Sequence, residues 1–101
     1  GIPPDELQQL LQDDLIVLID VREENEFEEV RIKGALNVPL SSFSNEEISR
    51  IASNKEVVFQ CRSGYRSALA AKEYYNGKAP QKHLEGGILA WGKSGKETIS
   101  N

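Results

Sequence analysis

A nearly continuous apolar run near the start of the chain restricts its fold more than any other feature. Residues 15–19 read LIVLI, without a polar side chain among them. A strand that is apolar on both faces is typical of a parallel sheet that helices cover on both sides. Residues 57–59, VVF, form a second run of this kind. Both runs are therefore predicted to be buried strands of an α/β domain.

Helical patterns alternate with these strands. Residues 3–6, PPDE, indicate a helix start, because proline and acidic side chains both suit a first helical turn. Further helices are predicted for residues 23–30, for the segment that begins with a capping box of Ser44 and Glu47, for residues 67–75 and for residues 88–91. This alternation predicts a three-layer α/β domain with a mainly parallel sheet.

Weaker patterns fill the remaining positions. Residues 32–40 predict a turn and a short strand, and residues 81–84 predict another short strand. Asn76 and Gly77 indicate the end of the helix over residues 67–75. With these additions, every segment between residues 3 and 91 has an expected place in the α/β order.

Length and charge limit the classes of protein to consider. A chain of 101 residues suits one domain, expected over residues 1–101 with its core over 2–92 and a frayed tail over 93–101. The formal net charge of −4 argues against a general nucleic-acid binder. No apolar run is long enough to span a membrane, so we expect a cytoplasmic protein without a membrane partner.

A single cysteine and a single histidine limit the chemistry further. They exclude an internal disulfide framework and make a structural metal site unexpected. The chain begins with Gly1 rather than methionine, as a fragment of a longer protein would. A neighbouring domain of that longer chain is then a further candidate partner.

The loop between the second strand and the helix that follows is the most informative stretch for function. Residues 59–67 read FQCRSGYRS and contain the single cysteine, Cys61. This order places Cys61 at the carboxyl end of a buried strand, where open α/β sheets bind ligands. The helix directs free N–H groups and partial positive charge at the loop. Gly64 lets the backbone turn where a Cβ would clash.

This setting predicts an ionised sulfur beside an anion site. The helix N-terminus and the cations Arg62 and Arg66 all favour the thiolate of Cys61, which is the nucleophilic form. The same N–H and guanidinium groups form a cradle for an anion. A lone cysteine is more often a buried structural residue. Two arginines, a glycine and a helix start within a few residues favour the nucleophile instead, at the mouth of a site.

Three other polar features have simpler interpretations. Asp20 and Arg22, at the end of the first strand, are expected to form a structural ion pair or cap, with positioning of the Cys61 loop as the functional alternative. The acidic residues 23–30 are interpreted as a solvated face without chemistry. His83 could be a base, but an ordinary structural role is favoured.

Four segments in this order resemble the rhodanese-like domain family: LIDVR at residues 18–22, IKGALNVPL at 32–40, CRSGYRS at 61–67 and LEGGILAW at 84–91. With their spacing they cover nearly the whole chain. The resemblance implies an α/β/α sandwich on a five-stranded parallel sheet, and transfer of sulfane sulfur through a cysteine persulfide. The chain departs from the family at residues 30–32, VRI, where Gly-His-Ile is common. This departure concerns the local turn and not the nucleophile.

The resemblance implies a two-step transfer by Cys61. Its thiolate takes the outer sulfur of a small anionic donor such as thiosulfate, and cyanide or a thiol then removes that sulfur. The implied reaction uses no cofactor, no metal and no general base. In the predicted site, Cys61 is the nucleophile, and Asp20 and Arg22 are supporting residues. The substrate-binding residues are those of the loop, namely Arg62, Ser63, Gly64, Tyr65, Arg66 and Ser67.

A phosphatase or arsenate reductase of the related cysteine-loop type is one alternative. Such loops hold a tetrahedral oxyanion and place arginine after five intervening residues. Here that position is Ser67, whereas Arg66 follows Cys61 after four residues. The shorter spacing predicts a loop that is too tight for phosphate but still admits a sulfur atom.

A non-catalytic module that binds a protein partner or regulates a neighbouring domain is another alternative. Such domains often lose the cysteine, whereas this chain retains Cys61 together with both arginines. The retained residues favour an enzyme. A Cys61→Ala variant that kept its biological role would favour the module.

Overall fold

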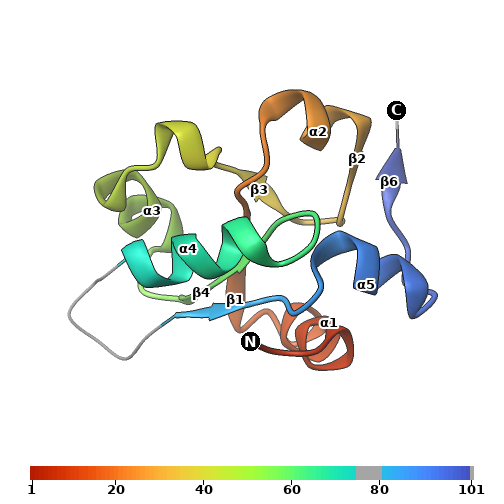
Figure 1. The fold of residues 1–101 in the computed structure, drawn as a ribbon. Helices are drawn as coiled ribbons and strands as arrows, with labels where there is room; N and C mark the ends of the chain where they lie inside the picture. Colours follow the sequence, from red (N-terminus) through yellow and green to blue (C-terminus); the bar gives the residue numbers. More distant parts are fainter. Residues whose placement is uncertain (75–80, 101) are drawn as a thin grey trace.

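The computed structural model describes residues 1–74 and 81–100. Its centre is a parallel sheet with the strand order β3-β1-β4-β5 (Figure 1). These strands are β1 (Ile16–Asp20), β3 (Leu36–Asn37), β4 (Glu56–Gln60) and β5 (Lys82–His83). A single parallel bridge between Ile2 and Leu84 continues the sheet beyond β5. The predicted parallel sheet is confirmed, with its fifth strand reduced to this bridge.

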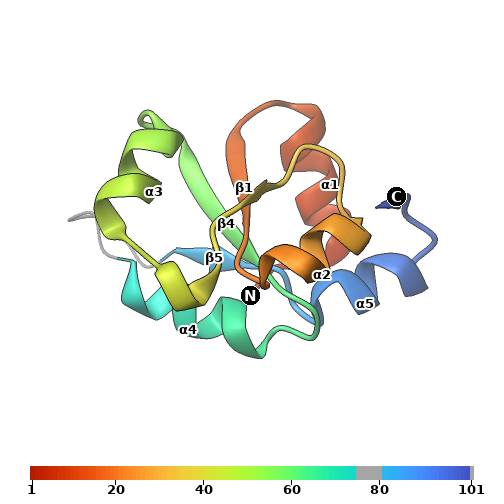
Figure 2. The same cartoon turned by 90° about the horizontal axis from the view of Figure 1, so that it is seen from above.

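Helices cover both faces of the sheet. They are α1 (Pro4–Gln12), α2 (Glu24–Glu29), α3 (Asn45–Ala52), α4 (Tyr65–Glu73) and α5 (Gly87–Lys93), with a short 3₁₀-helix η1 (Leu40–Ser42). Helices α3 and α4 pack on one face, and α1 and α5 pack on the other (Figure 2). The helix predicted over residues 67–75 begins two residues earlier, and its predicted end at Asn76 and Gly77 lies outside the described residues.

The two longest strands hold the layers together, because successive side chains of a strand point to opposite faces. Ile19 and Phe59 belong to the apolar cluster beneath α3 and α4. Leu18 and Val58 belong to the cluster beneath α1 and α5. All four side chains are buried. The sequence runs that lacked polar residues are therefore the strands with a core on both sides.

Strand register brings the segments of the candidate site to one edge of the sheet. Strands β1 and β4 are parallel, and Asp20 lies opposite Gln60 at their carboxyl ends. The backbone N–H of Val21 donates to the carbonyl of Gln60 over 2.9 Å, so the two chains leave the sheet together. Cys61 is the next residue after β4. The loop after β4 thus begins beside the loop after β1.

The C-terminal segment differs from the frayed tail expected over residues 93–101. Strand β6 (Ile99–Ser100) pairs antiparallel with β2 (Val30–Arg31). The indole N–H of Trp91 also donates to the carbonyl of Glu97 over 2.8 Å. A buried indole N–H needs an acceptor, and the returning chain supplies it. The tail therefore contacts β2 and α5 through interactions that its polar composition did not indicate.

Two properties of the described chain bear on the expected classes of protein. Across residues 1–74 and 81–100, no helix is long and apolar enough to cross a lipid bilayer. Within the same residues, histidine, cysteine and acidic side chains form no group of three that could hold a metal ion.

Candidate active site

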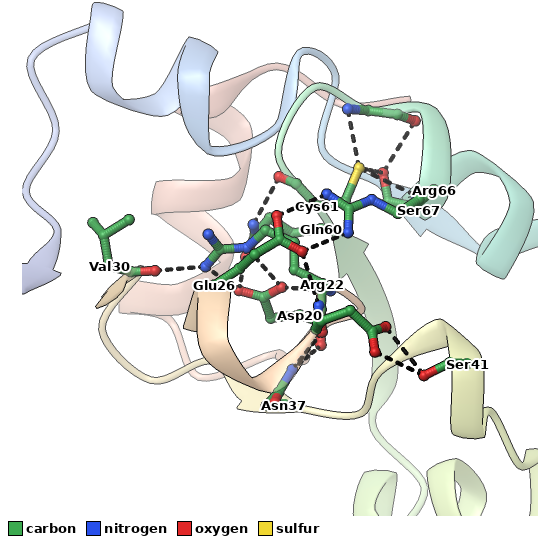
Figure 3. A network of polar contacts seen from close by, with 12 residues as sticks. Asp20, Arg22, Glu26, Val30, Asn37, Ser41, Gln60, Cys61, Arg66 and Ser67 are labelled. Carbon is green, nitrogen blue, oxygen red and sulfur yellow. Dashed lines mark hydrogen bonds and ion pairs between the residues drawn. The ribbon is translucent and has the colours of Figure 1, made fainter. Parts of the chain in front are cut away.

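The sulfur of Cys61 is the centre of the loop that follows β4. The backbone N–H of Gly64 donates to its Sγ over 3.1 Å, and the backbone N–H of Ser67 donates over 3.3 Å (Figure 3). Gly64 caps α4 with a φ of +106°, a conformation that glycine adopts without a Cβ clash. The helix start predicted to face the loop thus supplies hydrogen-bond donors to the sulfur itself. Such donors favour negative charge on sulfur.

Cys61 is more deeply buried than the sequence suggested. We expected a thiol at the mouth of a site, but only 1% of the residue is exposed. The two N–H groups direct the sulfur inward, where Cys61 joins the apolar cluster that contains Phe59 and Ala70. The loop residues Arg62 and Ser63 are exposed instead. A substrate therefore meets these exposed residues before it reaches the sulfur.

Arg66 does not stand free beside the sulfur, because Glu26 of α2 holds it. Their side chains form two hydrogen bonds, Nη1 to Oε1 over 2.7 Å and Nη2 to Oε2 over 3.0 Å (Figure 3). The hydrogen bond from Arg66 lowers the pKa of Glu26 from 4.5 to about 2, assisted by a backbone hydrogen bond from Glu23. The acidic segment that was assigned no chemistry therefore contributes one residue to the loop, which corrects that interpretation.

The charge of Arg66 acts on its surroundings in return. The pKa of Arg66 is raised, first by the hydrogen bond to Glu26 and then by the negative charges of Glu26, Cys61 and Asp20. Arg66 is thus within electrostatic reach of the sulfur.

The remaining predicted loop residues lie on the outer side of the loop. Arg62 is exposed, and among the described residues its side chain has no ion pair or hydrogen bond. Tyr65 is 73% exposed, and Ser63 is also exposed. The structure therefore joins Gly64 and Ser67 to the sulfur directly, whereas Arg62, Ser63 and Tyr65 border the approach to it.

Asp20 and Arg22 form the structural ion pair that their sequence position predicted. Arg22 Nη2 lies 2.7 Å from Asp20 Oδ2, and the two side chains are 3% and 0% exposed. Arg22 Nη2 also donates to the carbonyl of Val30 over 2.6 Å. Asn37 donates to the backbone carbonyls of both residues of the pair. The pair therefore ties β1, β2 and β3 together beside the start of the loop.

Helix α5 fixes the carbonyl side of the loop. The N–H of Ile88 donates to the carbonyl of Cys61 over 2.9 Å, and the N–H of Leu89 donates to the carbonyl of Arg62 over 3.2 Å. Gly87 has a φ of +60°, and a Cβ there would collide with the Arg62 carbonyl. In a trans peptide the C=O and the next N–H point in opposite directions. The N–H groups of Arg62 and Ser63 therefore point away from α5.

Ser67 connects the sulfur to a residue that the sequence analysis set aside. Its Oγ lies 3.5 Å from Cys61 Sγ and 3.1 Å from His83 Nδ1. The same hydroxyl is 3.2 Å from the carbonyl of Gly64, to which it can donate. His83 is part of β5, whose register with β4 places it opposite Phe59, two residues before Cys61. The register of β5 with β4 therefore brings His83 close to Ser67 and Cys61, and no local sequence pattern indicates this proximity.

Burial affects the protonation of this histidine. Desolvation lowers the pKa of His83 from 6.5, the positive charge of the N-terminal amino group lowers it further, and Glu85 opposes the shift. At neutral pH the imidazole is therefore uncharged. An uncharged imidazole has one nitrogen that can accept a proton or a hydrogen bond.

Comparison with known proteins identifies the family. The family model of the rhodanese-like domain matches residues 3–94. A rhodanese-related protein of Thermoplasma volcanium has a solved structure with a TM-score of 0.83 and 25% identity, which covers 98% of this chain and 96% of that chain. The chain therefore belongs to the rhodanese-like domain family, and the predicted family is confirmed.

Proteins related in sequence agree with this assignment. An uncharacterized protein of Synechocystis is 39% identical over 97% of this chain, which spans 55% of that relative. A protein of Allochromatium vinosum named as a sulfurtransferase is 34% identical over 92% of this chain and 87% of its own length. The chain thus resembles both a domain-sized sulfurtransferase and about half of a longer protein. Sulfurtransferase activity is the general activity that this family supports.

Proposed function

We propose that this chain is a sulfurtransferase that carries sulfane sulfur as a persulfide of Cys61. The donor is a small anionic sulfur compound such as thiosulfate, and the acceptor is cyanide or a thiol. One observation carries this proposal: two backbone N–H groups, from Gly64 and Ser67, donate to Cys61 Sγ. These donors stabilise negative charge on the sulfur whenever it acts as nucleophile or leaving group.

In the first step the thiolate of Cys61 attacks the outer sulfur of the donor. A bond forms between Sγ and that sulfur, and the bond from that sulfur to the rest of the donor breaks. With thiosulfate, sulfite leaves with the electron pair. Arg62, which has no side-chain partner among the described residues, and Arg66 provide positive charge for the donor and for the leaving anion.

In the second step the acceptor attacks the terminal sulfur of the persulfide. The bond from Sγ to the terminal sulfur breaks, and Cys61 leaves as a thiolate. Cyanide becomes thiocyanate, and an acceptor thiolate becomes a persulfide. The N–H groups of Gly64 and Ser67 stabilise the negative charge of this thiolate, as they do before the first step. The cycle is the ping-pong exchange that is typical of covalent catalysis.

The partner of the chain is part of the proposal. The Synechocystis relative is nearly twice as long as the stretch that this chain matches. A thiol acceptor on a neighbouring domain, or on a separate protein, is therefore proposed alongside a small thiol. The exposed residues around the loop, Arg62 and Tyr65 among them, are the surface that such an acceptor would contact.

The test is mass spectrometry of the protein after incubation with thiosulfate. We expect a gain of one sulfur atom on the peptide that contains Cys61, and its removal by cyanide with release of thiocyanate. The Cys61→Ser variant is the matched control and should gain no mass. A folded wild-type protein that never gains sulfur contradicts the proposal. An aryl phosphate in a parallel assay should not be hydrolysed.

A further inference from the structure

A short line of polar atoms leads from the buried sulfur to a partly exposed imidazole. Cys61 Sγ is 3.5 Å from Ser67 Oγ, and Ser67 Oγ is 3.1 Å from His83 Nδ1. The first two residues are almost completely buried, at 1% and 0% exposed, whereas His83 is partly exposed. The three side chains come from the end of β4, from α4 and from β5. Their alignment depends on the tertiary fold alone.

The burial of Cys61 raises a chemical question that the sulfur-transfer reaction leaves open. A thiol must lose its proton before it can attack, because the thiolate is the nucleophile. The residue has almost no contact with solvent in this conformation, so a neighbouring protein group is the nearest acceptor for the proton. The N–H groups of Gly64 and Ser67 are donors and cannot accept it. The Ser67 hydroxyl is an adjacent group that can.

A hydroxyl can accept one proton only if it releases another. Two atoms lie within reach of the Ser67 hydroxyl hydrogen, the Gly64 carbonyl at 3.2 Å and His83 Nδ1 at 3.1 Å. The amide carbonyl accepts a hydrogen bond but is a very weak base. An imidazole nitrogen accepts a proton near neutral pH. His83 is therefore the base that this hydroxyl can reach.

We propose that His83, acting through the hydroxyl of Ser67, takes the proton of the Cys61 thiol. The proposal rests on the sulfur-transfer function and makes His83 a positioning residue for it. The proton on Sγ moves to Ser67 Oγ, and the hydroxyl hydrogen of Ser67 moves to His83 Nδ1. The products are a thiolate and an imidazolium, and Ser67 keeps one hydrogen, which now points at the thiolate. No bond between heavy atoms changes and no electron is transferred.

The surroundings of His83 fit this role. Its pKa is lowered by burial and by the amino group of Gly1, so Nδ1 is available as an acceptor at neutral pH. Glu85 is the negative charge that acts on the ring and supports the imidazolium once it forms. The ring contacts Ser67 of α4, and the neighbouring Lys82 of β5 pairs with Glu6 of α1 at 3.8 Å. Among residues 1–74 and 81–100, His83 itself forms no ion pair that would compete with the uptake of this proton.

The test measures the reactivity of Cys61 without any sulfur donor. Alkylation by iodoacetamide, a small neutral reagent, is followed as a function of pH in the whole chain. His83→Gln keeps a hydrogen-bonding side chain but cannot take up a proton, so it removes the final acceptor for the proton of the Cys61 thiol. We expect alkylation at about pH 7 to slow by about tenfold, with the pH profile displaced to higher pH.

Companion variants separate a proton path from a packing effect. Ser67→Ala removes the hydroxyl but keeps the backbone N–H that donates to Sγ, and should slow alkylation as His83→Gln does. Ser67→Thr retains a hydroxyl and should keep the wild-type profile. Lys82→Gln, beside His83, should leave the rate unchanged. Circular dichroism and thermal melting show whether each variant is folded.

Each outcome decides the proposal. If folded His83→Gln alkylates at the wild-type rate with the wild-type pH profile, the proposal is overturned, whether or not Ser67→Ala is slow. If both variants are slow and Ser67→Thr is not, the proposal stands; if His83→Gln is slow while Ser67→Ala is not, or if Ser67→Thr is also slow, the path through the Ser67 hydroxyl is overturned. The alkylation needs no sulfur donor, so a failure of the sulfur-transfer function would appear only in the mass gain with thiosulfate.

Discussion

The Cys61 loop lies between two ion pairs that have the same closest distance and different surroundings. Asp20 and Arg22 are 2.7 Å apart, with side chains 0% and 3% exposed. Glu26 and Arg66 are also 2.7 Å apart, with side chains 27% and 31% exposed. The first pair ties three strands together behind the loop, and the second holds one loop arginine at its outer side. Distance alone therefore does not tell what an ion pair contributes.

Burial decides the energetic role of each pair. Removing one partner of a buried pair leaves an uncompensated charge away from water, which costs about 3–5 kcal/mol. An exposed or partly exposed pair is screened by solvent and contributes about 1 kcal/mol or less. The inner pair is consequently part of the framework, whereas the outer pair can be rearranged when a substrate binds. Substitutions in the two pairs, and of the unpaired loop residue Arg62, should therefore differ in size and in kind.

The largest effect is expected from Asp20→Asn. The substitution leaves the Arg22 guanidinium buried without a countercharge, so the free energy of unfolding should fall by about 3–5 kcal/mol. Urea denaturation followed by circular dichroism measures it. The matched control is Asp14→Asn, which removes the exposed pair with Lys55 and should change stability by less than about 0.5 kcal/mol. Equal urea midpoints for Asp20→Asn and the wild type would refute the structural role of the inner pair.

An intermediate effect is expected from Arg62→Ala, on kinetics rather than stability. Arg62 is exposed, and its side chain forms no ion pair with any residue in 1–74 or 81–100. Its charge is therefore available to an anionic donor. The KM for thiosulfate should rise by about fivefold at low salt, equivalent to about 1 kcal/mol. Steady-state assays of thiocyanate formation measure it, and Lys72→Ala on α4 is the control. An unchanged KM removes Arg62 from the anion cradle.

The smallest effect is expected from Glu26→Gln, which should be less stable than the wild type above pH 4.5 and approach the wild-type stability in acid. The pKa of Glu26 is lowered from 4.5 to about 2 in the folded chain. Its ion pair therefore stabilises the fold above pH 4.5, and this stabilisation is lost as the pH falls towards 2. The partly exposed pair contributes about 1 kcal/mol to the free energy of unfolding. Between pH 4.5 and 2 the free energy of unfolding should therefore fall by about 1 kcal/mol less in Glu26→Gln than in the wild type. Thermal melts at several pH values measure it; parallel curves for both proteins would contradict the assignment.

The sequence predicted the frame of this site because the frame is local. Two apolar runs indicated strands with a core on both faces, and the order strand, glycine-containing loop and helix placed N–H donors at Cys61. These features depend on residues that are neighbours in the sequence, and both the buried strands and the N–H donors are present in the structure. The burial of the thiol was not predicted, because the pattern does not show towards which side the sulfur turns.

The partners of the loop could not be predicted because they are distant in the chain. Glu26 lies 40 residues from Arg66, and His83 lies 16 residues from Ser67. Both contacts depend on strand order and register, which periodicity does not encode. An acidic helix and a single histidine are common features of soluble domains, so neither points to a function by itself. Tertiary placement alone distinguishes these two residues from others of their kind.

The attachment of the loop to α5 has a consequence for how this domain could change its chemistry. The carbonyls of Cys61 and Arg62 are both occupied by the first turn of α5, where Gly87 allows no side chain. An inserted residue that widened the loop for a larger oxyanion would displace these carbonyls from their donors. Evolution towards such a substrate would therefore require the last helix to move in step with the insertion, so loop length and helix position should change together.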